Sequence, residues 1–200
     1  MTLNKSVVES IGASPLAMVV TNPNRADNPI ELANPAFCEL TGYPEREIVG
    51  RNCRFLAGRD TEPNVRQQVR AAVEQQRPVL VDILNYRRDG TPFRNGVMIA
   101  PLFDANGTLS YFLGSQVVLP EGEAAPLSVR RARAAALVEG LPPRQRQVLE
   151  GMAHGLLNKQ IAYRLGIAEK TVKMHRVLML DRLGGITSAE AIRLAVEAGL

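Results

Sequence analysis

The sequence has no long hydrophobic run, and this absence argues against a membrane-spanning helix. No apolar stretch approaches the roughly 20 residues that cross a bilayer as a helix. The N-terminal residues MTLNKSVVES also lack the apolar centre of a signal peptide. We therefore expect the chain to stay in the cytoplasm and to have no membrane partner.

Cysteine is scarce, since the chain has only Cys38 and Cys53. Two cysteines can pair in a secreted protein, but without an export signal both are expected to be free thiols. The sequence also contains no internal repeat and no low-complexity tract, and we expect no metal site. Each cysteine therefore needs its own explanation.

The first 120 residues carry no net charge. They hold 12 Lys plus Arg and 12 Asp plus Glu, whereas residues 121–200 hold 12 and 8, so the net charge of +4 lies in the second part. A neutral first part and a basic second part favour a chain in which only the second part meets a polyanion.

From Leu16 to Pro120 the sequence is typical of strands with inserted helices. Short β-rich runs are separated there by clusters of Gly, Pro, Asn and Asp. Asn34 and Pro35 supply a cap and a first-turn proline for one helix. The expected elements are strands at 16–21 and 30–33, helices at 36–40 and 63–76, and a three-stranded antiparallel meander at 78–88, 91–103 and 108–119.

The pattern changes after Pro120, where the first domain is expected to end. Residues 129–139 are predicted to form a short helix closed by Gly140. From Leu141 onward the strand pattern is absent and three or four amphipathic helices are expected. The predicted division is a domain of strands and helices at 1–120, a linker at 121–140 and a helical domain at 141–200.

Two helix starts in the last domain have recognisable caps. Asn158 is predicted to cap one helix. Thr187 and Glu190 have the spacing of a capping box, which predicts that the final helix begins just after Thr187.

Three carboxamides fall among apolar residues on three successive predicted strands. Side chains alternate between the two faces of a strand. By this parity Asn85 lies with Val81 and Ile83, Asn95 with Val97 and Ile99, and Gln116 with Phe112 and Val118. Buried amides need partners, and a planar heterocycle with donors and acceptors on its edge, such as a flavin, would satisfy all three. Parity alone equally permits one or more of these strand ends to be solvated.

The runs GRNCRFLAG, DTEP, ILNYRRDGTPFRN and FLGSQV, in this order and spacing, closely resemble the LOV family of PAS-fold blue-light receptors. The resemblance implies an α+β PAS/LOV domain with a five-stranded antiparallel sheet. It also implies a noncovalently bound FMN that forms a reversible thioether at flavin C4a with a cysteine under blue light. Cys53 occupies that position, although a lone cysteine outside such a motif is usually a small buried hydrophobe. Cys38 has no motif around it and is expected to pack in a core.

The same resemblance assigns cofactor contacts residue by residue. It implies that Asn52, Asn85 and Asn95 bond the pyrimidine edge and ribityl chain, that Gln116 faces O4 and N5, that Arg54 and Arg70 hold the phosphate, and that Asn28 lies beside the ring. Guanidinium groups suit phosphate geometry. The chain departs from the family at Ala57, where many relatives have glutamine, so one polar contact to the cofactor is expected to be missing.

The run LPPRQRQVLEGMAHGLLNKQIAYRLGIAEKTVKMHRVLMLDRLGG, with the helix after it, resembles the LuxR-type helix-turn-helix family. The resemblance implies an all-α tetrahelical domain that binds double-stranded DNA through a helix from Glu169 to about Leu183. Helical periodicity places Val172, Met179 and Leu183 inward and Lys170, Met174 and Val177 outward, with Lys173 at the flank. By resemblance, Lys173, Met174 and Val177 read base edges, while Lys170, Thr171 and Arg176 lie nearer the phosphates.

The final helix has an apolar stripe of Ala189, Ile192 and Val196, and such a stripe requires a partner. In LuxR-type domains the partner is the same helix of a second subunit, so that a two-fold dimer binds a roughly palindromic site. In bacterial proteins that join these two domains, the sensor sheet covers this helix in darkness. By resemblance we expect a monomer in the dark and a homodimer in the light or on DNA.

The sequence therefore predicts a blue-light-activated DNA-binding transcriptional regulator that is not an enzyme. Nothing in it resembles a nicotinamide or substrate pocket, which a flavin enzyme would need. The alternative is a light-independent regulator that senses a redox state or a ligand through its PAS fold.

Overall fold

The computed structural model describes residues 5–119 and 127–200, and its first part is built on one antiparallel sheet. The strand order is β2-β1-β5-β4-β3, with every neighbouring pair antiparallel. The strands are β1 Ala17–Thr21, β2 Ile30–Ala33, β3 Val79–Tyr86, β4 Pro92–Phe103 and β5 Leu109–Val118. The predicted five-stranded sheet and its three-stranded meander are confirmed.

Short helices connect the second and third strands. They are α2 Pro35–Thr41, α3 Glu45–Ile48, the 3-10 helix η1 Cys53–Leu56, and α4 Pro63–Glu74. The predicted helices at 36–40 and 63–76 correspond to α2 and α4. The sequence reasoning missed α3 and an N-terminal helix, α1 Lys5–Gly12, which contacts the last helix of the chain.

Asn34 shows how one polar residue fixes the entrance to the sheet. Its buried side-chain oxygen accepts hydrogen bonds from the Phe37 amide at 3.0 Å, as the predicted cap of α2, and from the Met18 amide at 2.9 Å. Its amide nitrogen donates to carbonyls of the α1–β1 connection, including that of Leu16 at 2.8 Å. Because these bonds are buried, they hold α2 and α1 against β1.

The second part of the chain is helical, as predicted. Its helices are α5 Leu127–Glu139, α6 Pro143–Ala153, α7 Asn158–Leu165, α8 Glu169–Arg182 and α9 Ser188–Ala198. The expected linker helix is α5. Three or four helices were expected in the last domain, and the structure has four there, α6 to α9. Residues 120–126, where the first domain was predicted to end, lie outside the described ranges.

Of the two caps predicted in the last domain, one is confirmed and one is wrong. Thr187 Oγ1 accepts from the Glu190 amide at 3.2 Å, and Glu190 Oε2 accepts from the Thr187 amide at 2.8 Å, which completes the capping box. Asn158 is instead the first residue inside α7. Its Oδ1 accepts from Arg176 Nη1 at 2.7 Å, so a tertiary contact occupies the side chain that was expected to cap the helix.

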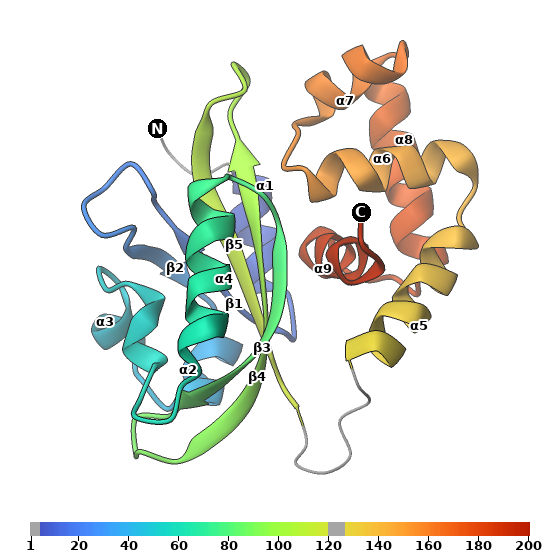
Figure 1. The fold of residues 1–200 in the computed structure, drawn as a ribbon. Helices are drawn as coiled ribbons and strands as arrows, with labels where there is room; N and C mark the ends of the chain where they lie inside the picture. Colours follow the sequence, from blue (N-terminus) through green and yellow to red (C-terminus); the bar gives the residue numbers. More distant parts are fainter. Residues whose placement is uncertain (1–4, 120–126) are drawn as a thin grey trace.

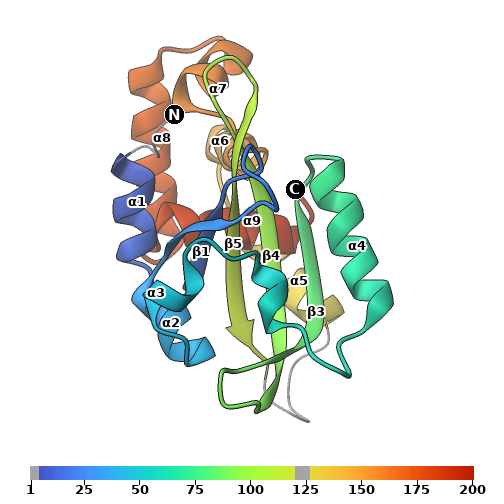
Figure 2. The same ribbon diagram turned by 90° about the vertical axis from the view of Figure 1, so that its left-hand side faces the viewer.

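Different helices cover the two faces of the sheet, as Figures 1 and 2 show, and each face has its own core. One face carries α2, α3, η1 and α4, and its core includes Val19, Ile30 and Phe37. The opposite face carries α1 and the second helical domain, and its core includes Met18, Met98 and Ile192. The alternation along β1 explains the division, because Val19 points to one face while Met18 and Val20 point to the other.

Among the described residues the two domains touch at several places, and α1 of the first domain packs on α9 of the second. Helix α9 contacts β3 and β4 across the face of the sheet, while α5 and α6 pack on α9. At the β4–β5 turn, the Phe103 amide donates to the Gly155 carbonyl at 3.2 Å, and Gln160 Nε2 donates to the Asp104 carbonyl at 2.8 Å. The sensor therefore holds both the last helix and the turn between α6 and α7.

Candidate functional site: the sheet face beside Cys53 and the exposed face of helix α8

The three carboxamides singled out in the sequence lie buried on one face of the sheet. Asn85, Asn95 and Gln116 come from β3, β4 and β5, and Asn95 Nδ2 donates to Asn85 Oδ1 at 2.9 Å. Register brings them together, since Asn95 is opposite Ile83 on β3 and Gln116 is opposite Val97 on β4. The alternative that these strand ends are solvated is wrong.

This face has unmet hydrogen-bonding capacity. Within the described chain, the buried side-chain oxygens of Asn28, Asn95 and Gln116 have no hydrogen-bond partner. A buried carboxamide without a partner is costly, and its oxygen and nitrogen exchange places by a half-turn of the side chain. Three such groups fit a ligand that offers both donors and acceptors, as the edge of a flavin ring does.

Cys53 begins η1, the 3-10 helix on the same side of the sheet, and it packs at the edge of that core. Burial raises the pKa of the Cys53 thiol to about 12, and a backbone hydrogen bond lowers it by less. The fold therefore keeps the thiol protonated. The protonated thiol therefore contributes to the stability of the folded protein. This contribution is complete below the ordinary thiol pKa and is lost as pH rises toward about 12.

The residues next to Cys53 have partners within the protein. Asn52 caps η1 by accepting from the Arg54 amide at 3.0 Å, and its Nδ2 donates to the Asp27 carbonyl at 2.6 Å and the Asn28 carbonyl at 3.3 Å. Arg54 forms an ion pair with Asp27. A cofactor contact by Asn52 Nδ2 would require it to leave these carbonyls, whereas the exposed Arg54 guanidinium has further N–H donors beyond those used by Asp27.

The two remaining predicted cofactor residues lie at opposite sides of the domain. Asn28 stands just before β2 with a left-handed φ of 46°, a conformation that Asn tolerates better than most residues. Arg70 is exposed on α4. Arg70 is thus available to solvent and to an anionic group.

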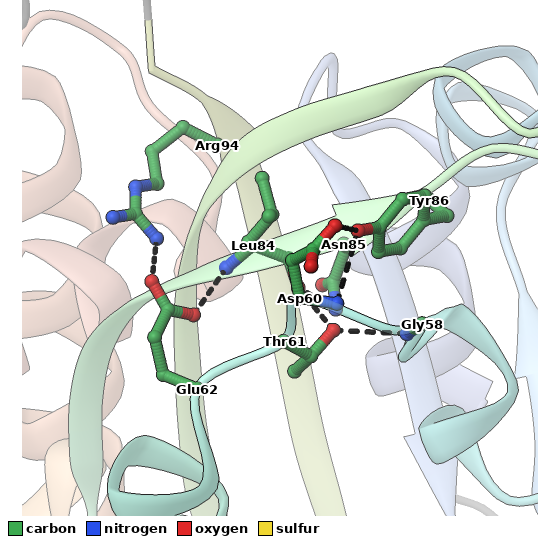
Figure 3. Close-up of polar contacts among 8 residues, drawn as sticks. All are labelled: Gly58, Asp60, Thr61, Glu62, Leu84, Asn85, Tyr86 and Arg94. Carbon is green, nitrogen blue, oxygen red and sulfur yellow. Dashed lines mark hydrogen bonds and ion pairs between the residues drawn. The ribbon is translucent and has the colours of Figure 1, made fainter.

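The loop between η1 and α4 is tied to β3 beside Asn85 (Figure 3). Thr61 Oγ1 donates to the Leu84 carbonyl at 2.7 Å and accepts from the Gly58 amide at 2.9 Å. Glu62 accepts from the Leu84 amide at 3.0 Å and pairs with Arg94. Burial acts to raise the pKa of Glu62, but these hydrogen bonds lower it overall. The carboxylate that fastens the loop is therefore charged at neutral pH.

Helix α8 has the amphipathic arrangement that the sequence predicts. Val172 and Met179 are buried, and Lys170, Lys173, Met174 and Val177 are exposed, with Val177 67% exposed. Lys173 forms an ion pair with Glu169 at 3.0 Å, and Thr171 is partly buried. The predicted base-reading face is open to solvent even while the domains are in contact.

Arg176 differs from the other residues predicted to contact DNA. Its Nη1 donates to Asn158 at 2.7 Å and its Nη2 donates to Ser188 Oγ at 2.9 Å, which links α8 to the starts of α7 and α9. Burial lowers the pKa of Arg176. A phosphate contact would require the guanidinium to leave these partners, so its position here is that of a structural link.

The apolar stripe of α9 is buried within the described structure. Ala189, Ile192 and Val196 belong to the core that also contains Met98 and Leu113 of the sheet. The sensor sheet and α9 therefore share one core, and a second subunit has no access to the stripe in this arrangement.

Sequence reasoning missed the polar residues in this domain interface. Arg193 lies within the stripe, is buried, and donates to the carbonyls of Gly96 and Ser115. Two features could have revealed the contact: a charged residue interrupts an apolar stripe, and a glycine lies inside a strand, where close backbone approach is common.

Two negative findings concern the described residues alone. No helix in the described ranges is long and apolar enough to span a membrane. Among the same residues, no three or more His, Cys, Asp or Glu side chains form a group that could hold a metal ion.

Comparison with known families identifies both parts. Residues 15–117 match the PAS domain family, and residues 139–195 match the bacterial regulatory proteins of the luxR family. Because the first match spans just over half of the chain, the protein belongs to the PAS domain family. The second match identifies a LuxR-type domain, which implies DNA binding.

Related proteins specify the kind of PAS domain. The chain is 46% identical over 109 residues to blue-light-activated histidine kinase 1 of Erythrobacter litoralis, a match that covers 54% of this chain and 30% of the kinase. It is 36% identical to the Aureochrome1 LOV domain in its light state, with a TM-score of 0.53 and coverage of 62% of this chain and 93% of that one. The first part is a LOV domain, and its relatives imply a flavin chromophore.

A third comparison supports the same assignment. The LOV domain of another blue-light-activated histidine kinase from Erythrobacter litoralis is 35% identical, with a TM-score of 0.52 and coverage of 54% of this chain and 99% of that one. The chain spans less than a third of the length of the curated kinase that it matches. The described chain therefore joins a LOV domain to a LuxR-type domain.

Proposed function

We propose that this protein is a transcriptional regulator whose dimerisation and DNA binding are activated by blue light through FMN bound on the sheet. The observation that carries the proposal is the position of the sheet. Its one face presents unpartnered amide oxygens and Cys53, and its other face buries the stripe of α9. Only the backbone of the sheet therefore lies between a ligand on the first face and helix α9 of the LuxR-type domain on the other.

The proposed cofactor contacts follow the chemistry of the side chains. Asn52, Asn85 and Asn95 would bond the pyrimidine edge and the ribityl chain of the flavin, and Gln116 would face O4 and N5. Asn28 would lie beside the ring. Arg54 and Arg70 would hold a terminal phosphate, since their charge and forked donors suit that group. The phosphate is the reason to propose FMN among the flavins.

A bound flavin would supply a blue-absorbing ring whose excited state accepts a thiol at C4a, in a bond that reverses in darkness. Cys53 would provide both the sulfur and the proton, because burial keeps its pKa far above neutrality. The proton would be taken up at the ring nitrogen N5, beside Gln116. The Gln116 amide would then face a donor instead of an acceptor, and it would have to reorient.

The effector half of the proposal concerns dimerisation. The reading face of α8 is exposed in the docked form, so docking does not block it. The buried stripe Ala189, Ile192 and Val196 is the surface that docking covers. We propose that the docked chain is a monomer, and that release of α9 allows two chains to pair and bind both half-sites of an operator.

The proposed DNA contacts are Lys173, Met174 and Val177 with base edges and Lys170 and Thr171 with phosphates. Methyl-bearing side chains suit thymine methyl groups, while lysines suit phosphates and guanine edges. Arg176 would support the reading helix through its internal bonds, and would contact phosphate only after rearrangement. This role needs no catalysis, and the cytoplasmic location expected from the sequence stays a prediction.

The test is to purify the protein, record its visible absorption in darkness and under blue light, and measure its mass in solution in both states. We expect a flavin spectrum that bleaches and recovers, with the mass rising from monomer to dimer as it bleaches. A flavin that does not bleach, or a spectrum without flavin, would refute the proposal in favour of a light-independent redox or ligand sensor.

A further inference from the structure

Arg193 is a buried charge in the middle of the apolar face of α9. The residue is 5% exposed, and its neighbours on that face are Ala189, Ile192 and Val196. Its Nη1 donates to the Gly96 carbonyl at 3.1 Å, the Ser115 carbonyl at 3.2 Å and Ser115 Oγ at 2.9 Å. An apolar side chain of similar volume often stabilises such a contact more than a buried guanidinium does. Packing alone therefore does not account for an arginine here.

The acceptors of Arg193 lie directly behind the proposed flavin contacts. Gly96 follows Asn95 on β4, and Ser115 precedes Gln116 on β5. Because successive residues of a strand point to opposite faces, Asn95 and Gln116 face the ligand side while their neighbours face α9. One guanidinium thus joins the two strands that carry two of the three buried amides.

The guanidinium groups of Arg130 and Arg193 both lie next to Gly96. Arg130 of the linker helix α5 donates to Asp82 of β3 at 2.6 and 2.8 Å, and Arg193 pairs with Glu197 at 3.1 Å. A Cβ at Gly96 would lie 3.1 Å from Arg130 Nη1 and 3.4 Å from Arg193 Nη2. The absence of a side chain at Gly96 makes room for both guanidinium groups.

We infer that Arg193 is a coupling residue: through its bonds to Gly96 and Ser115, it transmits changes in the flavin-bearing strands to α9. The inference rests on the proposed function. Hydrogen bonds depend on direction, and two of the three acceptors belong to Ser115, so a movement of β5 at Gln116 weakens those two bonds and leaves the guanidinium held only by the Gly96 carbonyl of β4. The released guanidinium is strongly stabilised by water, which favours separation of α9 once these bonds are disturbed.

Docking of α9 and its response to the sheet depend on different residues. Apolar packing by Ile192 and Val196 holds α9 on the sheet, whereas Arg193 makes that hold sensitive to the strands. An apolar residue at this position should keep α9 docked and remove its sensitivity. The double variant Arg193→Met, Glu197→Gln tests this, because it removes both charges of the buried pair and leaves no unpaired carboxylate.

The experiment measures hydrogen–deuterium exchange of residues 188–198 in the full chain, in darkness and under blue light, with flavin absorption recorded on the same samples. In the wild type we expect protection in darkness and loss of protection in light. In the double variant we expect a normal bleach, dark protection like that of the wild type, and loss of the light-induced increase in exchange. Arg131→Met, an exposed arginine of α5, is the matched control and should respond as the wild type does.

Two results would overturn the coupling role. One is a double variant with the full light-induced increase in exchange. The other is a double variant already unprotected in darkness, which would make Arg193 a simple clamp. Ser115→Ala removes only one acceptor, so it tests the same inference if the double variant fails to fold: a partial loss of the light response supports coupling, and a full response refutes it. A wild-type protein that does not bleach would refute both the proposed function and the coupling role. If the wild type bleaches and one of the two results above is obtained, only the coupling role is refuted.

Discussion

Replacement of Gly155 by alanine should increase the fraction of chains whose two domains are undocked in darkness. Gly155 lies in the turn between α6 and α7, and its carbonyl accepts from the Phe103 amide of the sensor at 3.2 Å. A Cβ at this position would lie 2.1 Å from the Pro101 carbonyl oxygen and 3.1 Å from the Phe103 ring. Backbone atoms cannot yield by that distance, so the turn must move away from the β4–β5 hairpin.

The size of the effect follows from two contributions. Gly155 has a φ of +73°, where a residue with a Cβ costs about 1–2 kcal/mol. Moving the turn also breaks the bonds from Phe103 and from Gln160 to Asp104, each of which contributes about 0.5–1.5 kcal/mol net. Only the second contribution concerns docking. Its sum of about 1–3 kcal/mol should raise a small undocked population by roughly 5- to 150-fold.

Gly166→Ala is the matched control. Gly166 ends α7 with a φ of +65°, and within the described structure an added Cβ would have no atom within 4 Å. It therefore carries the backbone strain without the collision. Small-angle scattering in darkness should give a larger radius of gyration for Gly155→Ala than for the wild type, and dark DNA binding should rise in parallel. The control should keep the wild-type radius; equal expansion in both variants would show that strain, and not the hairpin contact, separates the domains.

Further predictions concern the light reaction, the DNA contacts and the last helix. Cys53→Ala should bind flavin but lose the reversible bleach and light-stimulated DNA binding; a normal bleach would place the reactive thiol elsewhere. Since burial raises the pKa of Cys53 to about 12, its alkylation in darkness should not accelerate between about pH 7 and pH 9, whereas a solvent-exposed thiol would. Lys170→Ala should flatten the dependence of log affinity on log salt by about 0.9, while Met174→Ala should change base preference in a randomised operator pool; unchanged slope or preference argues against each role. Ile192→Glu should release α9 in darkness yet abolish the light-driven dimer, as light scattering would report; a dimer of normal affinity would exclude this stripe as the dimer contact.

Local sequence patterns were sufficient where the determinants are themselves local. Thr187 and Glu190 cap α9 because both partners lie within one turn, and Asn34 caps α2 for the same reason. Strand parity placed Asn85, Asn95 and Gln116 on the face of their apolar neighbours but left open whether those strand ends are solvated, and the structure shows that all three are buried. The identity of Cys53 as the candidate thiol required the family motif, because its surroundings in the sequence resemble those of any small buried residue.

Contacts between segments that are distant in the sequence could not be predicted from local patterns. Asn158 looked like a cap, but Arg176, 18 residues later, occupies its side chain. Helix α1 packs on α9 at the other end of the chain, so no nearby residue indicates its apolar partner. Arg193 acquires its acceptors from strands 97 and 78 residues away, and only the folded arrangement brings them together.

The central claim is that light absorbed on one face of the sheet controls DNA binding by the domain on the other face. The most direct test measures operator binding by one sample in darkness, under blue light and again in darkness, with flavin absorption followed throughout. We predict that affinity rises as the absorption bleaches and falls back as it recovers, with the same time course. DNA affinity that stays constant while the flavin bleaches and recovers would contradict the account.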